Sequence, residues 1–477
     1  FLYIMVKNIL FGLLVVVAMV GCNDDEEDIN YFPNSSFEGK TFVTDDQFER
    51  ELIKLGYDDV IDDMVLTENI SGVEILDFEV SEGQHIKDLT GIEDFTALKK
   101  LAFDGVELVT LDLSKNLSLE HLELKQNNGF FENDRWIGNL TNLNISKNNA
   151  LKHLEIRQSN LKRLDVTKNQ ALEYPVVIGR LTSLDVSKNT ELTYLNCHYN
   201  YLKELDIRRN TKITKLDCDY NELSELDISL NKAIDTLWCG ANQLTDLDLS
   251  QNIKLKFLSC YANQLSKLEL GQNKSLEFLH CGKNQLSSLD LKENTMLRKL
   301  YCRENQFTSL DFSPNTELIF LNCEKNQLTN LNITQNKKLI ELECSYNELS
   351  YLDVSQNRDL VGLRCYYNRL VSLDLRKNFN IEIVNCSYNQ IRSLDFSQNP
   401  NLTDAFAQNN KLEILNLKNG NNQNLTNGYG IRSAQDRFIN NESLKCVEVD
   451  DPAWAEEALA KWWFDEGVTF SEDCGYQ

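Results

Sequence analysis

The sequence predicts a solenoid, in which short coils of chain stack and their parallel β-strands form one continuous sheet on the concave side. The first observation is a set of cysteines that recur every 21 residues: Cys197, Cys218, Cys239, Cys260, Cys281, Cys302, Cys323, Cys344, Cys365 and Cys386. The second is the frame around each cysteine, Leu-x-x-Leu-x-Cys-x-x-Asn. The third is a frame in the other half of each repeat, Leu-x-x-Leu-Asp-Leu-x-x-Asn, as from Leu244 to Asn252.

The spacing within one coil explains the prediction. Leu258 and Cys260 are two residues apart, so both side chains point to the inward face of a short strand. Asn263 follows where the chain must bend, and its amide can satisfy backbone groups that the turn buries. Because one coil cannot bury its own apolar edge, stability comes from stacking on the neighbouring coils.

The first 40 residues are not expected to belong to this fold. Residues 1–21 contain a lysine and then an apolar run too short to span a bilayer, which is typical of a secretory signal peptide. The run ends in Val-Gly-Cys, which resembles the lipobox of bacterial lipoproteins and implies acylation of Cys22. Residues 22–40 begin with an acidic run and are expected to form a flexible tether. That run also resembles the surface-export signal of Bacteroidota lipoproteins, which implies an outer-membrane, cell-surface location.

Residues 41–95 are expected to form an N-terminal cap that covers the open end of the array. A helix is predicted after Thr44, with Phe48 and Leu52 on one face, and two strands follow over residues 65–70 and 73–78.

The repeat array is expected over residues 96–420. Its early coils begin at Leu98, Leu119, Leu151 and Leu172 and carry aliphatic residues in the cysteine position. An insertion at residues 128–139 predicts a loop on one face, and its aromatic side chains either contact a partner or pack back on the array: Phe130, Phe131 and Trp136.

Residues 421–477 are expected to form a C-terminal cap, with a strand at 444–449 and a helix that begins at Asp450-Asp451-Pro452. The repeat frames and both end segments are similar to the cysteine-ladder class of bacterial internalins and their Bacteroidota relatives. The resemblance implies a leucine-rich repeat solenoid with short strands and turns on the convex side and α-helical caps. The resemblance indicates the fold more directly than the function, because one fold serves many functions.

Apart from Cys22, the cysteines fall into two groups. The ladder thiols occupy the slot that other coils fill with Leu, Ile or Val, so they are expected to be buried, free and without a metal. Cys446 and Cys474 lie outside the array, and a disulfide between them is expected to hold the terminal helix over the last coil.

The second frame carries a column of acidic residues for which two interpretations stay open, a solvated outer strand balanced by Lys and Arg, or a calcium-binding column. The column consists of Asp165, Asp185, Asp206, Asp227, Asp248, Glu269, Asp290, Asp311, Asp353, Asp374 and Asp395.

The positions that flank the buried Leu and Cys predict the ligand-binding surface, because they point outward and carry aromatic residues in adjacent coils. The candidates are Trp238, Phe257, Tyr261, Phe278, His280, Tyr301 and Phe320. A second aromatic set lies nearer the asparagine turns: Tyr199, Tyr220, Tyr346, Tyr366, Tyr367 and Tyr388. The alternative is that these rings only stabilise the sheet.

The remaining features favour recognition over catalysis. A net charge of −25 argues against nucleic acid as a partner. The five histidines have no metal-ligand spacing, and the sequence contains no phosphate-binding loop or nucleophile elbow, so we expect neither a cofactor nor an enzyme. The sequence predicts a non-catalytic adhesion or scaffold protein that binds an extracellular or host protein. The alternatives are a glycan-binding surface lipoprotein and a structural envelope protein.

Overall fold

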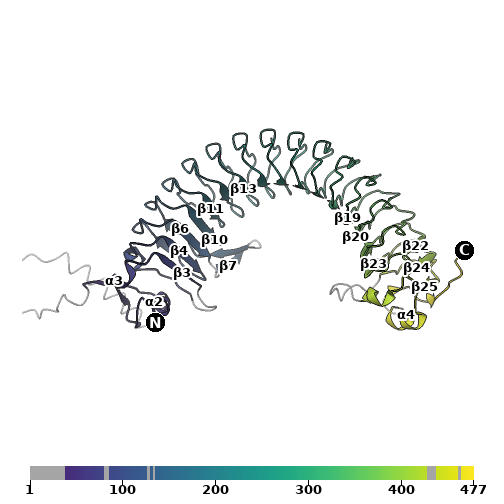
Figure 1. Ribbon diagram of the computed structural model, residues 1–477, viewed down its shortest axis with the longest axis horizontal. Helices are drawn as coiled ribbons and strands as arrows, with labels where there is room; N and C mark the ends of the chain where they lie inside the picture. The colour runs from purple at the N-terminus through teal and green to yellow at the C-terminus, as the bar shows by residue number, and fades with distance from the viewer. Residues whose placement is uncertain are drawn as a thin grey trace, which may run out of the picture.

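The computed structural model describes residues 38–79, 85–125, 129–132, 135–426, 437–459 and 463–476. The expected signal peptide, Cys22 and the tether up to residue 37 lie outside these residues. The chain forms an open arc whose parallel sheet lines the inner side, with short turns on the outer side (Figure 1). The predicted solenoid is therefore confirmed.

The inner sheet has sixteen strands in the described part of the chain, and the order in space follows the order in sequence. The early strands are β3 (Ile75–Glu79), β4 (Lys100–Asp104), β6 (His121–Lys125), β10 (His153–Arg157) and β11 (Tyr174–Val177). The later strands are β12 (Tyr194–Asn196), β13 (Lys215–Asp217), β14 (Thr236–Trp238), β15 (Phe257–Ser259), β16 (Phe278–His280), β17 (Lys299–Tyr301), β18 (Phe320–Asn322), β19 (Glu341–Glu343), β20 (Gly362–Arg364), β21 (Ile383–Asn385) and β23 (Asp404–Phe406).

Register is constant along the regular array, so the buried middle residue of each strand pairs with that of the next coil, as Leu258 does with Leu279. The ten ladder cysteines are fully buried and free. Leu124, Ile156 and Val177 fill the same slot in the early coils and are also buried. The core is thus one continuous column that runs the length of the arc, as the spacing predicts.

Two columns of buried asparagines tie each coil to the one before it. Asn263 Nδ2 donates to the carbonyls of Cys239 at 3.0 Å and Cys260 at 3.1 Å, and its Oδ1 accepts from Leu244 N at 3.0 Å. In the second frame Asn252 Nδ2 donates to the carbonyls of Ile228 and Asn231 at 3.2 and 3.1 Å. The turn role predicted for Asn263 is confirmed, and the second column adds cross-coil bonds on the outer side.

The N-terminal segment differs in one element from the prediction. Helix α2 (Asp46–Lys54) is present, and Asp45 accepts from the backbone N–H groups of Gln47 and Phe48 at its start. The predicted strand at 65–70 is wrong in its second half, because β2 (Met64–Leu66) gives way to a helical turn, α3 (Thr67–Ile70). β2 has only β1 (Lys40–Phe42) to pair with, and the turn brings Ile70 into the core, where it is fully buried. A 3₁₀ turn, η1 (Ile92–Asp94), leads into the array.

The insertion forms an antiparallel hairpin of β7 (Gly129–Glu132) and β8 (Arg135–Gly138). Phe130, Phe131 and Trp136 lie on its two strands. In Figure 1 the hairpin extends from the sheet towards the open centre of the arc. The structure does not describe these side chains, so the choice between partner contact and local packing stays open.

The C-terminal end of the arc carries a second parallel sheet of β22 (Ser393–Asp395), β24 (Ile414–Asn416), β25 (Cys446–Glu448) and β26 (Thr469–Ser471). β25 is the strand predicted at 444–449, but it extends this second sheet and not the inner one. β5 (Thr110–Asp112) pairs with β9 (Asn142–Asn144) in the same half of the early coils. The 3₁₀ turn η2 (Asn422–Thr426) and helix α4 (Pro452–Ala458) complete the end, with Asp451 accepting from Ala453 N and Trp454 N.

Candidate functional site

Six of the seven residues predicted to bind a ligand lie on five adjacent strands of the inner sheet, β14 to β18, and the seventh, Tyr261, follows the end of β15. Each strand is three residues long, with its middle leucine buried and the two flanking side chains turned to the concave side. Because the register is constant, side chains 21 residues apart are direct neighbours, as Phe257 and Phe278 are. The sequence period therefore brings Phe257 and Phe278 together directly, whereas Trp238 and Tyr301 occupy the other flanking position of their strands and meet these rings diagonally.

The rings form an unbroken series, which we call the aromatic row: Trp238, Phe257, Phe278, Tyr301 and Phe320. Successive ring centroids along it are 5.1, 4.0, 5.5 and 4.5 Å apart. Phe257 and Phe278 are stacked with only 6° between their planes. Separations in this range are those of favourable aromatic pairs.

All five rings of the aromatic row are half-buried, because each ring shelters its neighbours. The aromatic row therefore has the geometry that both interpretations require. It stabilises the sheet through ring contacts between strands, and it presents a broad apolar band to the concave side. Removal of several rings at once is expected to lower stability as well as alter the surface.

Tyr261 and His280 form a side branch of the aromatic row, with centroids 4.5 Å apart. Burial, together with the positive charge of the nearby Arg303, lowers the pKa of His280 to about 4, so the ring is neutral at pH 7. His280 Nε2 is buried without a hydrogen-bond partner among the described residues. The Tyr261 hydroxyl accepts from Arg303 Nη2 at 3.4 Å, and the Lys283 ammonium lies 5.4 Å from the ring centroid. This branch is the polar edge of an otherwise apolar band.

The second aromatic set is more exposed than the aromatic row. Tyr220, Tyr346, Tyr367 and Tyr388 are each 39–40% exposed, and stacked pairs join them to neighbours, as in Tyr367–Tyr388 at 4.0 Å. The backbone φ angles of these four tyrosines and of Tyr199 lie between 51° and 55°. A bulky residue in this left-handed region is strained relative to Gly or Asn. The sequence places these tyrosines near the turns but does not reveal their exposure or backbone conformation.

An open hollow of about 500 Å³ adjoins the N-terminal end of the aromatic row. Its walls come from β11 to β14 and the residues just before two of these strands: Tyr174, Thr193, Tyr194, Thr214, Lys215 and Trp238. Trp238 thus belongs both to the hollow and to the aromatic row. Sequence reasoning missed the other five residues, because only the stacking of four coils brings them around one space.

A carboxylate pair beside the hollow was also missed. Burial, together with the negative charge of Asp217, raises the pKa of Asp219 to about 7. Asp219 Oδ1 accepts a hydrogen bond from Gly240 N, and Asp217 Oδ2 lies 3.0 Å from His198 Nδ1. Asp219 therefore titrates near neutral pH.

The acidic column has a local structural role that neither interpretation included. Ten of its aspartates accept a hydrogen bond from the backbone N–H two residues on, as Asp248 Oδ1 does from Ser250 N at 2.9 Å. Hydrogen bonds from Arg208 hold the pKa of Asp206 at about 2. Ten of the eleven column residues lie outside any strand, two residues before a turn, and Asp395 lies on β22, which corrects the expected outer strand. No group of three or more potential metal ligands occurs in the described residues.

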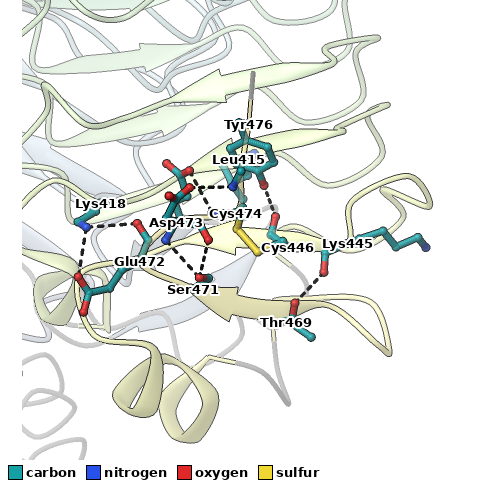
Figure 2. The surroundings of a disulfide bond; sticks show 12 residues. Leu415, Lys418, Lys445, Cys446, Thr469, Ser471, Glu472, Asp473, Cys474 and Tyr476 are labelled. Atoms are coloured by element: carbon teal, nitrogen blue, oxygen red, sulfur yellow. Dashed lines mark hydrogen bonds and ion pairs between the residues drawn. A yellow bond between two sulfur atoms is a disulfide. The ribbon is translucent and has the colours of Figure 1, made fainter.

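The remaining site predictions concern cysteines. Burial raises the pKa of every ladder thiol, which makes these groups poor nucleophiles. Cys446 and Cys474 are joined by a disulfide, with Cα atoms 5.8 Å apart (Figure 2). Tyr476, just beyond it, donates from its hydroxyl to the Cys446 carbonyl and accepts from Leu415 N at 3.4 Å. The disulfide and Tyr476 together hold the end of the chain against β24 and β25.

Comparison with known proteins agrees with this architecture. The functional domain of InlJ from Listeria monocytogenes, whose structure includes a cysteine ladder, is 31% identical to the chain with a TM-score of 0.67. The match covers 77% of this chain and 81% of that domain. The chain belongs to the leucine-rich repeat family. Residues 76–189 of this leucine-rich repeat protein also match the family description of the leucine-rich repeat domain of the endo-beta-N-acetylglucosaminidase EndoS.

Two further solved structures share the fold of this leucine-rich repeat protein. A leucine-rich repeat protein of Leptospira interrogans is 21% identical over 72% of this chain and 89% of its own, with a TM-score of 0.60. The ectodomain of the Arabidopsis thaliana receptor kinase GASSHO1/SCHENGEN3, in complex with CASPARIAN STRIP INTEGRITY FACTOR 2, is 17% identical, with a TM-score of 0.53. That match covers 73% of this chain and 51% of the receptor chain. No curated protein gives a significant match.

The leucine-rich repeat solenoid is typical of non-catalytic proteins that recognise other proteins. Within the described residues, no helix combines the length and the apolar character needed to cross a membrane.

Proposed function

We propose that this leucine-rich repeat protein is held at the outer cell surface by a lipid on Cys22 and recognises an extracellular protein, such as a host protein, through its concave face. The observation that carries the proposal is the aromatic row, a half-exposed apolar band across five adjacent strands. Single exposed rings are common on protein surfaces, whereas a contiguous band is typical of an interface. Trp and Tyr, at Trp238 and Tyr301, are the residues enriched in interface hot spots.

The partner surface is tested with the purified chain against a panel of purified extracellular proteins, measured by biolayer interferometry. At least one partner is expected to bind, and the triple variant Phe257→Ala, Phe278→Ala, Tyr301→Ala is expected to weaken it by about tenfold or more. Because these rings also contact each other, thermal unfolding of the variant is recorded, and binding is measured well below its midpoint.

Tyr351→Ala is the matched control, because Tyr351 is 61% exposed and has no ring contact with the aromatic row. The control is expected to bind as the wild type does. Equal binding by the triple variant, or no binding to any protein of the panel, contradicts the proposed partner surface.

The anchor is tested separately. Cys22→Ala is expected to abolish incorporation of labelled palmitate and to move the protein from the membrane fraction to the soluble fraction. Unchanged labelling in this variant excludes Cys22 as the site of acylation. Protease treatment of intact cells then distinguishes an outward-facing protein, which is degraded, from one that faces the periplasm.

A further inference from the structure

The hollow beside the aromatic row has a composition that differs from the row itself. Tyr174 and Tyr194 line it from β11 and β12, and Trp238 lines it from β14. In register, Lys215 on β13 lies between Tyr194 and Thr236. Thr236 occupies the position that Phe257 and Phe278 fill in the next two strands, and its shorter side chain leaves the space open. The volume of about 500 Å³ is within the range of small-molecule sites.

The charged side chain that lines the hollow is Lys215. Lys215 is exposed, and its ammonium group forms no ion pair with any described residue. Lys125 on the concave side is paired with Glu123 and Arg364 with Glu343. Lys299, at the same strand position as Lys215, also has no ion pair with any described residue but lies outside the hollow. In a chain of net charge −25, an ammonium without an ion pair in a concave site favours an anionic ligand. The other outward side chain of β13, Asp217, lies 3.0 Å from His198 Nδ1 and forms no ion pair with Lys215.

The other polar groups of the hollow suit hydroxyl groups. The Thr214 hydroxyl donates to the Thr193 carbonyl at 3.1 Å, which leaves its oxygen as an acceptor towards the hollow. The Tyr194 hydroxyl accepts from Asn196 Nδ2 at 2.9 Å and keeps its own proton to donate. Burial raises the pKa of Tyr194, so this proton is retained at pH 7.

We propose that the hollow binds a single pyranose ring that carries a carboxylate, of the uronic acid or sialic acid class. The apolar faces of the ring pack on Tyr174, Tyr194 and Trp238, and the carboxylate pairs with Lys215. The sugar hydroxyls bond to Thr214 and Tyr194. An acidic peptide side chain would also pair with Lys215, but it has no ring to fill the space between three aromatic side chains. The site is distinct from the partner surface of the aromatic row, with which it shares only Trp238.

The test uses isothermal titration calorimetry on the full chain with methyl glucuronide and the methyl glycoside of N-acetylneuraminic acid. Methyl glucoside is the neutral match of the first probe, and a glutamate-containing tetrapeptide is the peptide probe. At least one acidic sugar is expected to bind in the millimolar range, about fivefold or more tighter than methyl glucoside. Equal binding of methyl glucuronide and methyl glucoside without binding of the sialoside, or no sugar binding, overturns the proposal. Tetrapeptide binding without sugar binding does the same.

Lys215→Met removes the charge and keeps the length of the side chain. This variant is expected to bind the acidic sugar no more tightly than the wild type binds methyl glucoside. Lys299→Met is the matched control, since Lys299 holds the same strand position four coils later and lies outside the hollow. An equal loss in both variants overturns the proposal, because it indicates a general effect of surface charge. Binding of the protein partner is expected to be unchanged in Lys215→Met, so the two proposals fail independently.

An array of glycans that end in uronic or sialic acid then identifies the source of the sugar. If the protein is retained on the glycan array, and Lys215→Met is retained more weakly than Lys299→Met, the ligand of the site is the terminal acidic sugar of a glycan. Binding of the free glycoside without retention on the array assigns the site to a free acidic sugar. Both outcomes support the proposed chemistry of the hollow.

Discussion

At the scale of single residues, the coil depends on side chains that replace backbone partners. The asparagine columns are the clearest case, because Asn263 is only 8% exposed and bonds to carbonyls of two coils and to the N–H of a third segment. Buried backbone groups left without partners are costly. This explains why an amide, which both donates and accepts, stands at this turn in every regular repeat.

Asn263→Ala is expected to lower the free energy of unfolding by about 1–3 kcal/mol, because it leaves Leu244 N–H without its side-chain partner and removes one of the two amide donors to the Cys239 carbonyl. Gln264→Ala is the control, since Gln264 is the exposed neighbour of Asn263. Chemical denaturation followed by circular dichroism measures both variants. A loss in Gln264→Ala as large as that in Asn263→Ala would contradict this role of the amide.

Asp219 makes stability depend on pH near neutrality. Burial raises its pKa from 3.8 to about 7 in the folded chain, so folding favours its protonated form. The stability that this group contributes is present below about pH 4 and is lost as the pH rises to about 7. Asp219→Asn keeps an acceptor for Gly240 N. In this variant the urea concentration at the unfolding midpoint is expected to decrease less between about pH 4 and about pH 7 than in the wild type. A slope identical to that of the wild type would exclude Asp219 as its source.

At the scale of elements, three-residue strands are too short to be stable alone, and their side chains link them. Strands β14 to β18 share the aromatic row, and β19 and β20 share the ion pair of Glu343 with Arg364 at 2.9 Å. The strands are therefore joined by contacts across coils as well as by backbone hydrogen bonds.

Phe257 and Phe278 are expected to be energetically coupled by about 0.5–1.5 kcal/mol in a double-mutant cycle with alanine, because their rings stack at 4.0 Å. The cycle is measured by chemical denaturation. Phe257 paired with the distant Tyr367 is the control and is expected to be additive. Additivity of Phe257 with Phe278 would mean that the stacked rings contribute no energy beyond their separate burial.

At the scale of the whole molecule, an arc of stacked coils has two ends, and the C-terminal end is closed covalently. The Cys446–Cys474 bond spans 28 residues and fixes the last turn of chain on the second sheet. Arg437 also closes this end, since its guanidinium lies 4.8 Å from the Phe406 ring and 4.2 Å from the Trp463 ring and pairs with Asp404 at 2.9 Å.

The double variant Cys446→Ser, Cys474→Ser is expected to lower stability by about 2–4 kcal/mol, because the reduced chain gains conformational freedom when it unfolds. Thermal unfolding with and without a reductant measures this, and the reductant is expected to affect the wild type only. The ladder cysteines are free in both proteins, so a reductant cleaves no bond among them and any difference between the two proteins comes from Cys446–Cys474. Equal sensitivity of the variant to reductant would contradict the assignment.

Much of this molecule follows from the repeat period. An interval of 21 residues between Cys239, Cys260 and Cys281 requires equal coils, and equal coils place side chains one period apart in contact. The buried cysteine slot, the asparagine turns and the contacts of Phe257 with Phe278 were therefore predictable. The helical turn at Thr67–Ile70 was not, because its residues form a strand pattern and only the burial of Ile70 against the first coil selects the turn.

The sequence by itself determined which side chains point inward and which become neighbours, because constant register converts distance along the chain into contact in space. Only the tertiary structure decided how far each outward side chain is sheltered and what spaces lie between them. The half-buried state of the aromatic row, the greater exposure of Tyr367 and Tyr388, and the hollow around Lys215 all depend on side chains from several coils at once. Their shapes and charges combine only when the coils are stacked.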